Sequence, residues 1–446
     1  MTGSAVSVLH AAACYLPYQI GGTEVYLHGL ISELGRLGMS SIVLVPRSGD
    51  APERYEHAGA SVETYSVNET PAPNEIRDRT PHQDFDLFRA HLLKHRAAIY
   101  HQHSWTRGCG PHHLQAARDL GFRIVLTVHV PANICLRGTM LRFGEGACDG
   151  RVEEKACGAC WAQDRGAPKP LARAIANLPL GIAKCARRGE TRLATAFSAR
   201  ALAAERLGHI AQMVENSDRI VAVCQWLHSA LAANGVPKHK LVLSRQGVSD
   251  DYVDTARAIA ATRTTPDAPL KLLFLGRWQP VKGIEVVVRA VRSLSPQTRV
   301  HLTIRAPRGG FEEQAYEARV RTLAEADGRI CIEGPVSRDA LAPLMPDYDA
   351  LVVPSLWLET GPLVVLEAQA AGLFVLGSRL GGIAELVDEG DAGELVEAGN
   401  VAAWAASIKR LASRRRQGAL PRPSRPVRTM STVASEMADL YRSLQR

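Results

Sequence analysis

The sequence predicts an α/β protein made of two doubly wound parallel-sheet domains that face each other across a cleft. The chain has 446 residues and 46% hydrophobic content, too much for one ordinary core and enough for two. Short apolar runs alternate with helical patterns in two separate series, which is typical of parallel sheets covered by helices. The segment Thr264–Pro269, which has prolines and no periodicity, separates the series. Ligands of such sheets bind beyond the carboxyl ends of the strands, so the cleft is the expected site.

The first series predicts a domain over residues 1–263. Residues 5–10 form its first predicted strand, Gly21-Gly22 is a glycine turn, and a helix with regularly spaced apolar residues follows and ends at Gly38. Further strands are expected from their short β-rich runs, at residues 41–45, 98–101, 123–129, 219–224 and 241–244.

A basic helical segment is predicted at residues 165–215 of this domain. Between Arg165 and Arg206 there are nine Lys or Arg and two acidic residues, so most of the formal +8 charge of the chain lies within this window. Interleaved Leu, Ile and Ala favour either a solvated helix face or a basic amphipathic surface that meets anionic lipid head groups. Aromatic interleaving is missing, so nucleic acid is not an expected partner.

The second series predicts a domain over residues 264–428. Its strands are expected at residues 270–276, 300–305, 329–333, 350–354 and 373–377. The remaining residues, 429–446, contain a helical pattern from Thr432 to Leu444, and we expect this helix to cross back to the first domain.

Two glutamates eight positions apart, Glu359 and Glu367, are the strongest chemical signal. The first lies in a Thr-Gly-Pro turn, and the second lies in a helix that Pro362 can open. The unpaired N–H groups of that first turn and the helix dipole favour phosphate, and carboxylates accept hydrogen bonds from hydroxyl groups. Phosphate beside a polyol indicates a nucleotide sugar. The alternative is that both carboxylates only stabilise the helix start through its dipole.

Three motifs carry a family resemblance. They are the run Phe274-Leu-Gly-Arg-Trp-Gln-Pro-Val-Lys-Gly283, the glutamate pair, and Gly381-Gly382-Ile-Ala-Glu385. Together they resemble the signature of family 4 of the retaining glycosyltransferases, over essentially the whole chain. The resemblance implies the GT-B fold, in which two Rossmann-like domains face a cleft. It also implies hexosyl transfer from a nucleoside-diphosphate sugar to a glycan or lipid-linked oligosaccharide in polysaccharide biosynthesis, with no cofactor required for catalysis.

The resemblance also implies roles for residues of the second domain. Arg277 and Lys282 would clamp the diphosphate and neutralise the charge that develops on the leaving group, a task suited to cations on a strand-to-helix turn. Glu359 would bind hydroxyls of the transferred sugar, and Glu367 would bind the ribose. The remaining nucleotide-sugar contacts fall on the turn around residue 336 and on the turn after the first glutamate: Val336, Thr360, Gly361 and Leu363.

In the first domain the resemblance assigns Gly21, Gly22 and His129 to the site. Gly22 has no side chain, so its N–H can approach a phosphate at the start of the first helix. His129 ends an apolar strand and would bind the donor sugar, although a lone histidine there is more often structural. Residues 101–104, His-Gln-His-Ser, follow another predicted strand and are candidates for the acceptor side.

The resemblance implies retention by front-face substitution without a protein nucleophile, and the sequence leaves a covalent intermediate open as the alternative. One alternative is a scaffold that binds a nucleotide sugar without turnover. A Rossmann oxidoreductase is disfavoured because the first turn reads Gly-Gly-Thr-Glu, not Gly-x-Gly-x-x-Gly. The second predicted strand also ends in Val45-Pro46-Arg47 with no acidic residue.

A cysteine-rich insert is predicted at residues 131–165. Cys135, Cys148, Cys157 and Cys160 fall within twenty-six residues, and the last two form Cys-x-x-Cys. This spacing is compatible with a structural zinc ion or with reduced thiols. The chain has no apolar run of membrane-spanning length and no secretory signal pattern. We therefore expect a soluble cytoplasmic protein, with the basic segment in peripheral contact with the inner face of the membrane, and few disulfides.

Overall fold

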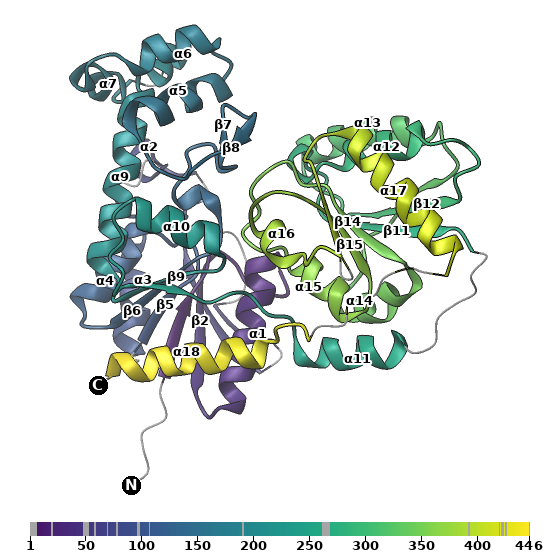
Figure 1. Cartoon of the computed structure of the whole chain (residues 1–446). Coiled ribbons are helices and arrows are strands. Elements are labelled where there is room, and N and C mark those ends of the chain that lie inside the picture. The colour runs from purple at the N-terminus through teal and green to yellow at the C-terminus, as the bar shows by residue number, and fades with distance from the viewer. Residues whose placement is uncertain are drawn as a thin grey trace. The chain divides into compact units, whose positions relative to one another are not determined.

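The chain forms two compact units in a computed structural model, residues 1–245 with 430–446, and residues 246–429 (Figure 1). Each unit is described by itself. The structure describes residues 7–445 apart from 19–20, 48–52, 58, 69, 77–78, 96–98, 107, 190, 261–267, 391–392, 419, 421–422 and 424–425. Within these residues, every helix is too short or too polar to cross a membrane.

The first unit is built on an eight-stranded sheet with the order β10-β9-β6-β5-β1-β2-β4-β3. All neighbours pair in parallel except β3 and β4, and Leu9 of β1 lies opposite Ile42 of β2 and Tyr100 of β5. The chain moves outward from β1 on one side and then returns to β5 on the other, so the sheet changes direction between β1 and β5. That switch point is where open α/β sheets bind ligands. The strands are β1 (Ser7–Ala11), β2 (Ser40–Arg47), β3 (Arg54–His57), β4 (Ala60–Ser66), β5 (Ile99–Gln102), β6 (Arg123–Val128), β9 (Arg219–Ala222) and β10 (Leu241–Leu243).

The C-terminal helix α18 (Met430–Gln445) belongs to this first unit. Its apolar face, which includes Val433 and Tyr441, packs with Tyr26 of α1 (Gly22–Arg36) and with Val8 of β1 in one buried cluster. A Cβ on Gly29 would lie 2.9 Å from the Met430 side chain, so glycine allows the two helices to approach closely. The other helices around this sheet are α2 (Pro73–Ile76), α3 (Phe85–Lys94), α4 (Pro111–Asp119) and α10 (Gln225–Ala233).

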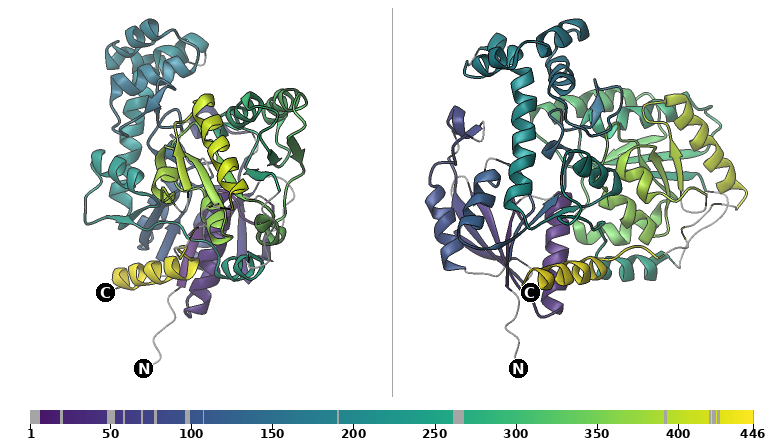
Figure 2. Two further views of the ribbon diagram at one scale, coloured as in Figure 1. Left: turned by 45° about the vertical axis from the view of Figure 1, so that its right-hand side comes forward. Right: turned by 60° about the vertical axis from the view of Figure 1, so that its left-hand side comes forward.

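The cysteine-rich and basic segments form a small helical group that is joined to the sheet region by the long helix α9 (Ala199–Asn216) (Figures 1 and 2). Its buried core is small and is made mainly of alanines around Trp161 and Ile175. The other elements are the short helix η1 (Pro131–Asn133), the two-residue strands β7 (Leu141–Arg142) and β8 (Gly146–Ala147), α5 (Glu154–Asp164), α6 (Lys169–Ala176), α7 (Leu180–Ala186) and α8 (Arg192–Phe197).

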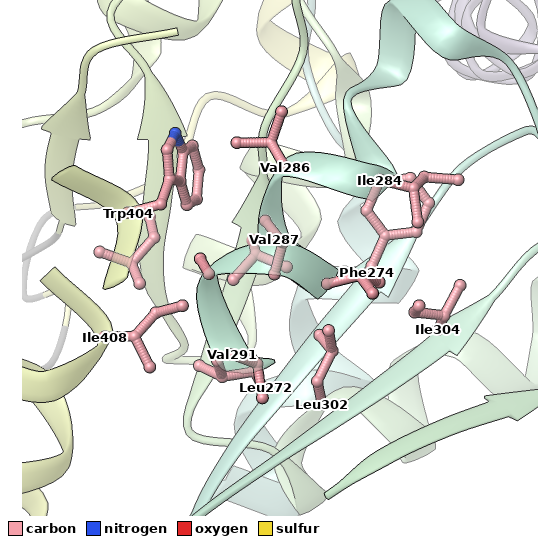
Figure 3. Close-up of a cluster of buried hydrophobic side chains, with 14 of the residues drawn as sticks. Leu272, Phe274, Ile284, Val286, Val287, Val291, Leu302, Ile304, Trp404 and Ile408 are labelled. Carbon is pink, nitrogen blue, oxygen red and sulfur yellow. The ribbon is translucent and has the colours of Figure 1, made fainter. Parts of the chain in front are cut away.

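The second unit is a six-stranded parallel sheet with the order β13-β12-β11-β14-β15-β16. Alternate residues of β11 contribute to different cores. Leu272 and Phe274 pack with α12 (Ile284–Ser293) and α17 (Val401–Arg416). Leu273 packs with α11 (Asp250–Ala260), α14 (Arg338–Leu344) and α15 (Leu363–Ala370). Figure 3 shows the first of these cores, with Trp404 and Ile408 of α17 beside the valines of α12. The strands are β11 (Leu270–Leu275), β12 (Val300–Arg305), β13 (Ile330–Glu333), β14 (Ala350–Val353), β15 (Phe374–Ser378) and β16 (Gly393–Val396).

The helices of the second unit lie on both faces of its sheet (Figure 1). They are α11 (Asp250–Ala260), η2 (Pro280–Lys282), α12 (Ile284–Ser293), α13 (Phe311–Ala324), α14 (Arg338–Leu344), η3 (Met345–Asp347), α15 (Leu363–Ala370), α16 (Gly381–Leu386) and α17 (Val401–Arg416).

The boundary between the units lies at Gln246, not at residue 264. Helix α11 is part of the second unit because Tyr252 and Val253 pack with Leu341 and Val365 in its core. Most of the predicted linker, residues 264–267, lies outside the described residues. Strands β3, β4, β7, β8 and β16 were not predicted; β16 is four residues long and begins with glycine, so its β-pattern is weak.

Candidate functional site

The loop that carries Arg277 and Lys282 follows β11 and is held against the end of β14. Gly283 has φ of +70°, and a Cβ at this position would lie 1.9 Å from the carbonyl oxygen of Pro354. Only glycine allows this contact. The Leu356 N–H also donates to the Val281 carbonyl oxygen over 2.7 Å. The two loops are therefore fixed to each other at the carboxyl edge of the sheet.

Glu359 is the centre of a hydrogen-bond group built by these loops. Its Oε1 accepts from Lys282 Nζ at 2.7 Å, Ser355 Oγ at 2.8 Å and Trp357 Nε1 at 2.9 Å. The Lys282 ammonium lies 5.4 Å from the centre of the Trp357 ring. Only 9% of the Glu359 side chain is exposed, so its orientation is set before any ligand arrives.

The guanidinium of Arg277 differs from the Lys282 ammonium in being exposed and unpaired. Among the residues that the structure describes, none forms a hydrogen bond or ion pair with this guanidinium. Its loop is ordered by backbone hydrogen bonds from Gln279 to Arg277 and from Lys282 to Gln279. The predicted pair thus consists of one cation held by a carboxylate and one cation open to an anionic ligand.

The turn from Thr360 to Leu363 leads into α15 and is shaped by two glycines. Gly361 has φ of +150°, and a Cβ on Gly382 would lie 2.7 Å from the Thr360 carbonyl carbon. The Gly382 N–H donates to the Glu359 carbonyl oxygen over 2.6 Å. Helix α15 begins at Leu363, and Pro362 is its N-cap, not its first helical residue as predicted. The first-turn N–H groups of α15 therefore follow directly after the Glu359 turn.

Glu367 lies on the body of α15 and is paired with a residue that the sequence analysis missed. Its carboxylate forms an ion pair with Arg338, at the start of α14, and only 4% of the Glu367 side chain is exposed. The Arg338 guanidinium lies 5.9 Å from the ring of Tyr252, whose hydroxyl donates to the Glu367 carbonyl oxygen. The sequence could have pointed to Arg338 through its position, because it follows the turn after β13 that also contains Val336. The Val336 side chain is half-buried against the core.

In the first unit, Gly21 is the N-cap of α1 and Gly22 is its exposed first residue. The Glu24 carboxylate folds back to this helix start: its Oε2 would lie 2.6 Å from a Cβ on Gly21, and its Oε1 accepts from Cys14 Sγ at 3.0 Å. A carboxylate there is stabilised by the helix dipole. It also occupies part of the position predicted for phosphate, which leaves Gly22 as the more accessible of the two glycines.

His129 follows the end of β6 and lies in a buried row of histidines. Its Nε2 is 3.3 Å from His103 Nδ1, and His103 Nε2 is 3.1 Å from His10 Nδ1. The Tyr26 ring packs edge-on against His129, with ring centres 4.9 Å apart. Burial lowers the pKa of His129 and of His10 to about 3, and it also lowers the pKa of His103. These rings are therefore neutral at physiological pH and can exchange hydrogen bonds without carrying charge.

The prediction that His101 and Gln102 line the acceptor side is wrong. Both side chains are completely buried. His101 bonds to Tyr441 of α18 at 2.6 Å and to Thr127 of β6 at 2.7 Å, and so joins the C-terminal helix to the sheet. Ser104 is half-buried and accepts from the Ala13 N–H. Buried polar groups need such partners, which explains why these residues are polar without a ligand.

The family is decided by two matches that together span most of the chain. Residues 21–246 match the model of the glycosyl transferase 4-like domain, and residues 269–414 match the model of the glycosyl transferases group 1. The chain is a family 4 glycosyltransferase. Its two parallel-sheet units have the GT-B fold.

Known relatives of this glycosyltransferase cover nearly its whole length. The D-inositol 3-phosphate glycosyltransferase of Pseudarthrobacter chlorophenolicus is 25% identical over 407 residues, which are 88% of this chain and 82% of the relative. The sucrose-phosphate synthase of Thermosynechococcus elongatus has a TM-score of 0.62 and 19% identity, with 98% of this chain and 99% of that chain covered. HepE of Anabaena, in complex with UDP and glucose, has a TM-score of 0.60 and 15% identity, with coverage of 98% and 99%.

Proposed function

We propose that this glycosyltransferase moves a hexose from a nucleoside-diphosphate sugar to a hydroxyl group of a glycan or lipid-linked oligosaccharide, with retention of anomeric configuration. The observation that carries the proposal is the group around Glu359 at the carboxyl edge of the second sheet. There an oriented carboxylate bonded to Lys282 precedes the N-terminal turn of α15 in the chain, and the exposed Arg277 lies on the loop that carries Lys282. Cations and free N–H groups suit a diphosphate, and the carboxylate suits sugar hydroxyls.

In the proposed reaction, the bond from the anomeric carbon to the diphosphate oxygen breaks and a bond to the acceptor oxygen forms on the same face. The acceptor proton passes to the departing diphosphate. Arg277 and Lys282 stabilise the negative charge that develops on that leaving group. The ammonium of Lys282 has three donors, so it can contact phosphate while it remains bonded to Glu359.

The surroundings of Glu359 support front-face substitution over a covalent glycosyl-enzyme. One of its oxygens already accepts three hydrogen bonds, which lowers its electron density and fixes its direction. Such a carboxylate is better suited to holding hydroxyls than to attacking carbon. Glu367, shared with Arg338, offers acceptor capacity for the ribose.

The donor is proposed to be a UDP-sugar because HepE, a GT-B relative, is known with UDP and glucose. Thermal shift with UDP-, GDP- and ADP-sugars tests this, since a ligand that binds only the native state raises Tm by mass action. We expect a rise of about 5 °C at a concentration of 100 times Kd for one base only. Arg277→Ala should remove most of the shift, and Arg289→Ala, an exposed arginine of α12, should leave it unchanged. A full shift in Arg277→Ala would contradict the clamp.

The alternative is a scaffold that binds a nucleotide sugar without turnover. It predicts the same thermal shift, so turnover must be measured separately. Release of UDP on addition of acceptor, with the anomeric configuration of the product read by NMR, distinguishes the two. Inverted product would refute retention, and binding without any product across glycan, lipid-linked and phosphorylated polyol acceptors would favour the scaffold.

Peripheral contact with an anionic membrane is proposed from the small helical group. Four of the ten large hydrophobic side chains that are exposed in the described chain lie in α6 to α8: Leu171, Ile182, Leu193 and Phe197. Exposed cations accompany them, at Arg173, Lys184 and Arg188. Exposed apolar residues among cations are typical of helices that lie on anionic lipid surfaces. A lipid-linked acceptor would be reached from such a surface.

Vesicle sedimentation tests this contact. The protein should bind vesicles that contain phosphatidylglycerol at low salt and should be released by high salt. Leu193→Glu should reduce binding severalfold, whereas Leu93→Glu, at another exposed leucine, in α3, should not. Equal recovery in the supernatant with anionic and neutral vesicles would remove the support for a membrane-bound acceptor and would favour a small soluble one.

A further inference from the structure

The four cysteines of the insert come from separate elements and line one pocket of about 490 Å³. Cys135 follows η1, Cys148 follows β8, and Cys157 and Cys160 lie in α5. The last two are three positions apart on the helix, so they share one face. All four are free thiols in the structure. Nothing in the proposed glycosyl transfer uses this pocket.

The backbone is arranged to donate hydrogen bonds to these sulfur atoms. The Phe143 N–H donates to Cys160 Sγ over 3.1 Å, and the Glu153 N–H donates to Cys157 Sγ over 3.4 Å. Backbone N–H groups directed at sulfur are typical of metal-thiolate sites, where the ligand atoms accept hydrogen bonds from surrounding groups. Gly150 has φ of +82°, which only glycine adopts readily, so the sharp turn after Cys148 is built into the sequence.

The charge of the pocket also favours a negatively charged group. Among its lining residues, one acidic side chain, Glu153, stands against five cations: Arg137, Arg142, Arg151, Lys155 and Arg173. Zn²⁺ with four thiolates carries two net negative charges, which such a lining can balance. Arg137 already pairs with Asp164 over 3.0 Å, so this compensation concerns the other four cations.

The insert has little other means of holding its shape. Between Cys135 and Cys148 the only regular structure is the pair of two-residue strands, β7 and β8. The nearby core consists of a few small residues around Trp161. A segment with so little buried apolar surface is the kind that a structural metal stabilises.

We propose that Cys135, Cys148, Cys157 and Cys160 bind one structural zinc ion that orders the insert. Zinc prefers four tetrahedral thiolate ligands, and spacings with a Cys-x-x-Cys pair are typical of its structural sites. Among the described residues, the groups with three ligand atoms within 4.8 Å of one another involve histidine and glutamate and do not include these cysteines. Binding therefore requires the loops to draw in around the ion, which couples the metal to the local fold.

Metal content of the purified full-length protein tests the proposal. Elemental analysis should find one zinc per chain, and a mercurial thiol reagent should release it. Replacing both Cys157 and Cys160 by serine should lower zinc more than tenfold, whereas replacing Cys185 and Cys331, exposed cysteines outside the pocket, should not. Wild-type protein with less than a tenth of an equivalent, or with iron in place of zinc, would overturn the proposal.

Two measurements on the wild-type sequence remain informative if the double variant fails to fold. Cobalt exchanged into the site should show the visible absorption of tetrahedral Co²⁺–thiolate coordination. Removing the metal with a chelator should increase proteolytic cleavage within residues 131–165 at least severalfold, and adding zinc back should restore resistance. No cobalt spectrum together with unchanged cleavage would refute a structural metal.

Discussion

Lys282 and Glu359 are in contact although seventy-seven positions separate them in the chain. Sequence patterns identified both residues as ligand-binding groups, but not their ion pair, because that depends on how two loops meet. The same holds for Glu367 and Arg338, twenty-nine positions apart. Each carboxylate is thus held by a cation, and Arg277 is left exposed to meet a ligand. The tertiary structure therefore decides which charged side chains pair with each other and which one stays exposed.

Glu359→Gln tests the role of the oriented carboxylate. The change keeps the side-chain volume and removes the charge that holds Lys282 and accepts sugar hydroxyls. We expect kcat/KM to fall by about 100-fold or more, the usual effect of losing one oriented electrostatic contact. Nucleotide release measured over a range of donor concentrations gives this value. Glu317→Gln, which removes a surface ion pair of α13, is the matched control and should change kcat/KM less than twofold.

The histidine row predicts a pH dependence of stability. The folded pKa of His10 and of His129 is about 3, below the ordinary value of 6.5. Between these values the unfolded chain binds protons that the folded chain does not, so the unfolding free energy falls as the pH drops below 6.5. Each histidine contributes a slope that approaches about 1.4 kcal/mol per pH unit.

Urea unfolding of the first unit at several values between pH 7 and pH 5 measures that slope. Replacing His129 by glutamine should reduce it, and replacing His239, an exposed histidine of the same unit, should not. Equal slopes in wild type and His129→Gln would show that His129 is protonated in the folded protein, contrary to its burial.

At the scale of elements, glycines decide where the site loops can lie. The loop after β11 approaches the end of β14 so closely that a single methyl group at Gly283 would overlap the Pro354 carbonyl. Helix α15 starts after a turn in which Gly361 has φ of +150°. The sequence marked both glycines as part of motifs. Their physical reason, close approach of one backbone to another, appears only in the folded structure.

Gly283→Ala should therefore be damaging to both stability and activity. The new Cβ would lie 1.9 Å from a carbonyl oxygen at a φ of +70°, so the loop must move and carry Lys282 away from Glu359. We expect a loss of about 2 kcal/mol or more in the second unit and strongly reduced turnover. Calorimetry and nucleotide release measure the two effects. Gly310→Ala, where a Cβ has open space and φ is negative, is the control; similar losses there would refute the steric account.

On the scale of the whole molecule, the first unit is built from both ends of the chain. Helix α18 supplies Val433, Met437 and Tyr441 to a core shared with α1 and β1, so the C-terminal helix completes a core that packs on the first sheet. The helical pattern predicted that this helix returns to the first domain. The predicted start of the second domain, residue 264, was wrong because α11 already packs in the second unit. Helical periodicity identifies an amphipathic helix, and it does not identify the surface on which the helix lies.

A chain that ends at Thr429 tests the contribution of α18. Its absence exposes the apolar residues of α1 and removes the Tyr441 partner of His101. We expect the first unit to lose cooperative unfolding while the transition of the second unit persists, because its cores are formed within residues 246–429. Calorimetry and hydrogen exchange distinguish the two units. Gln445→Ala, a change at an exposed position of the helix end, should leave both transitions in place.

The sequence by itself determined the fold class, the two parallel sheets, most of their strands and the identity of the charged residues at the site. Those properties follow from local periodicity and from motifs whose residues are close in the chain. The tertiary structure decided which charges pair, that His101 and Gln102 are internal supports, that Glu24 occupies the start of α1, and that four cysteines line one pocket. These depend on contacts between residues far apart in sequence, and only the packed chain specifies them.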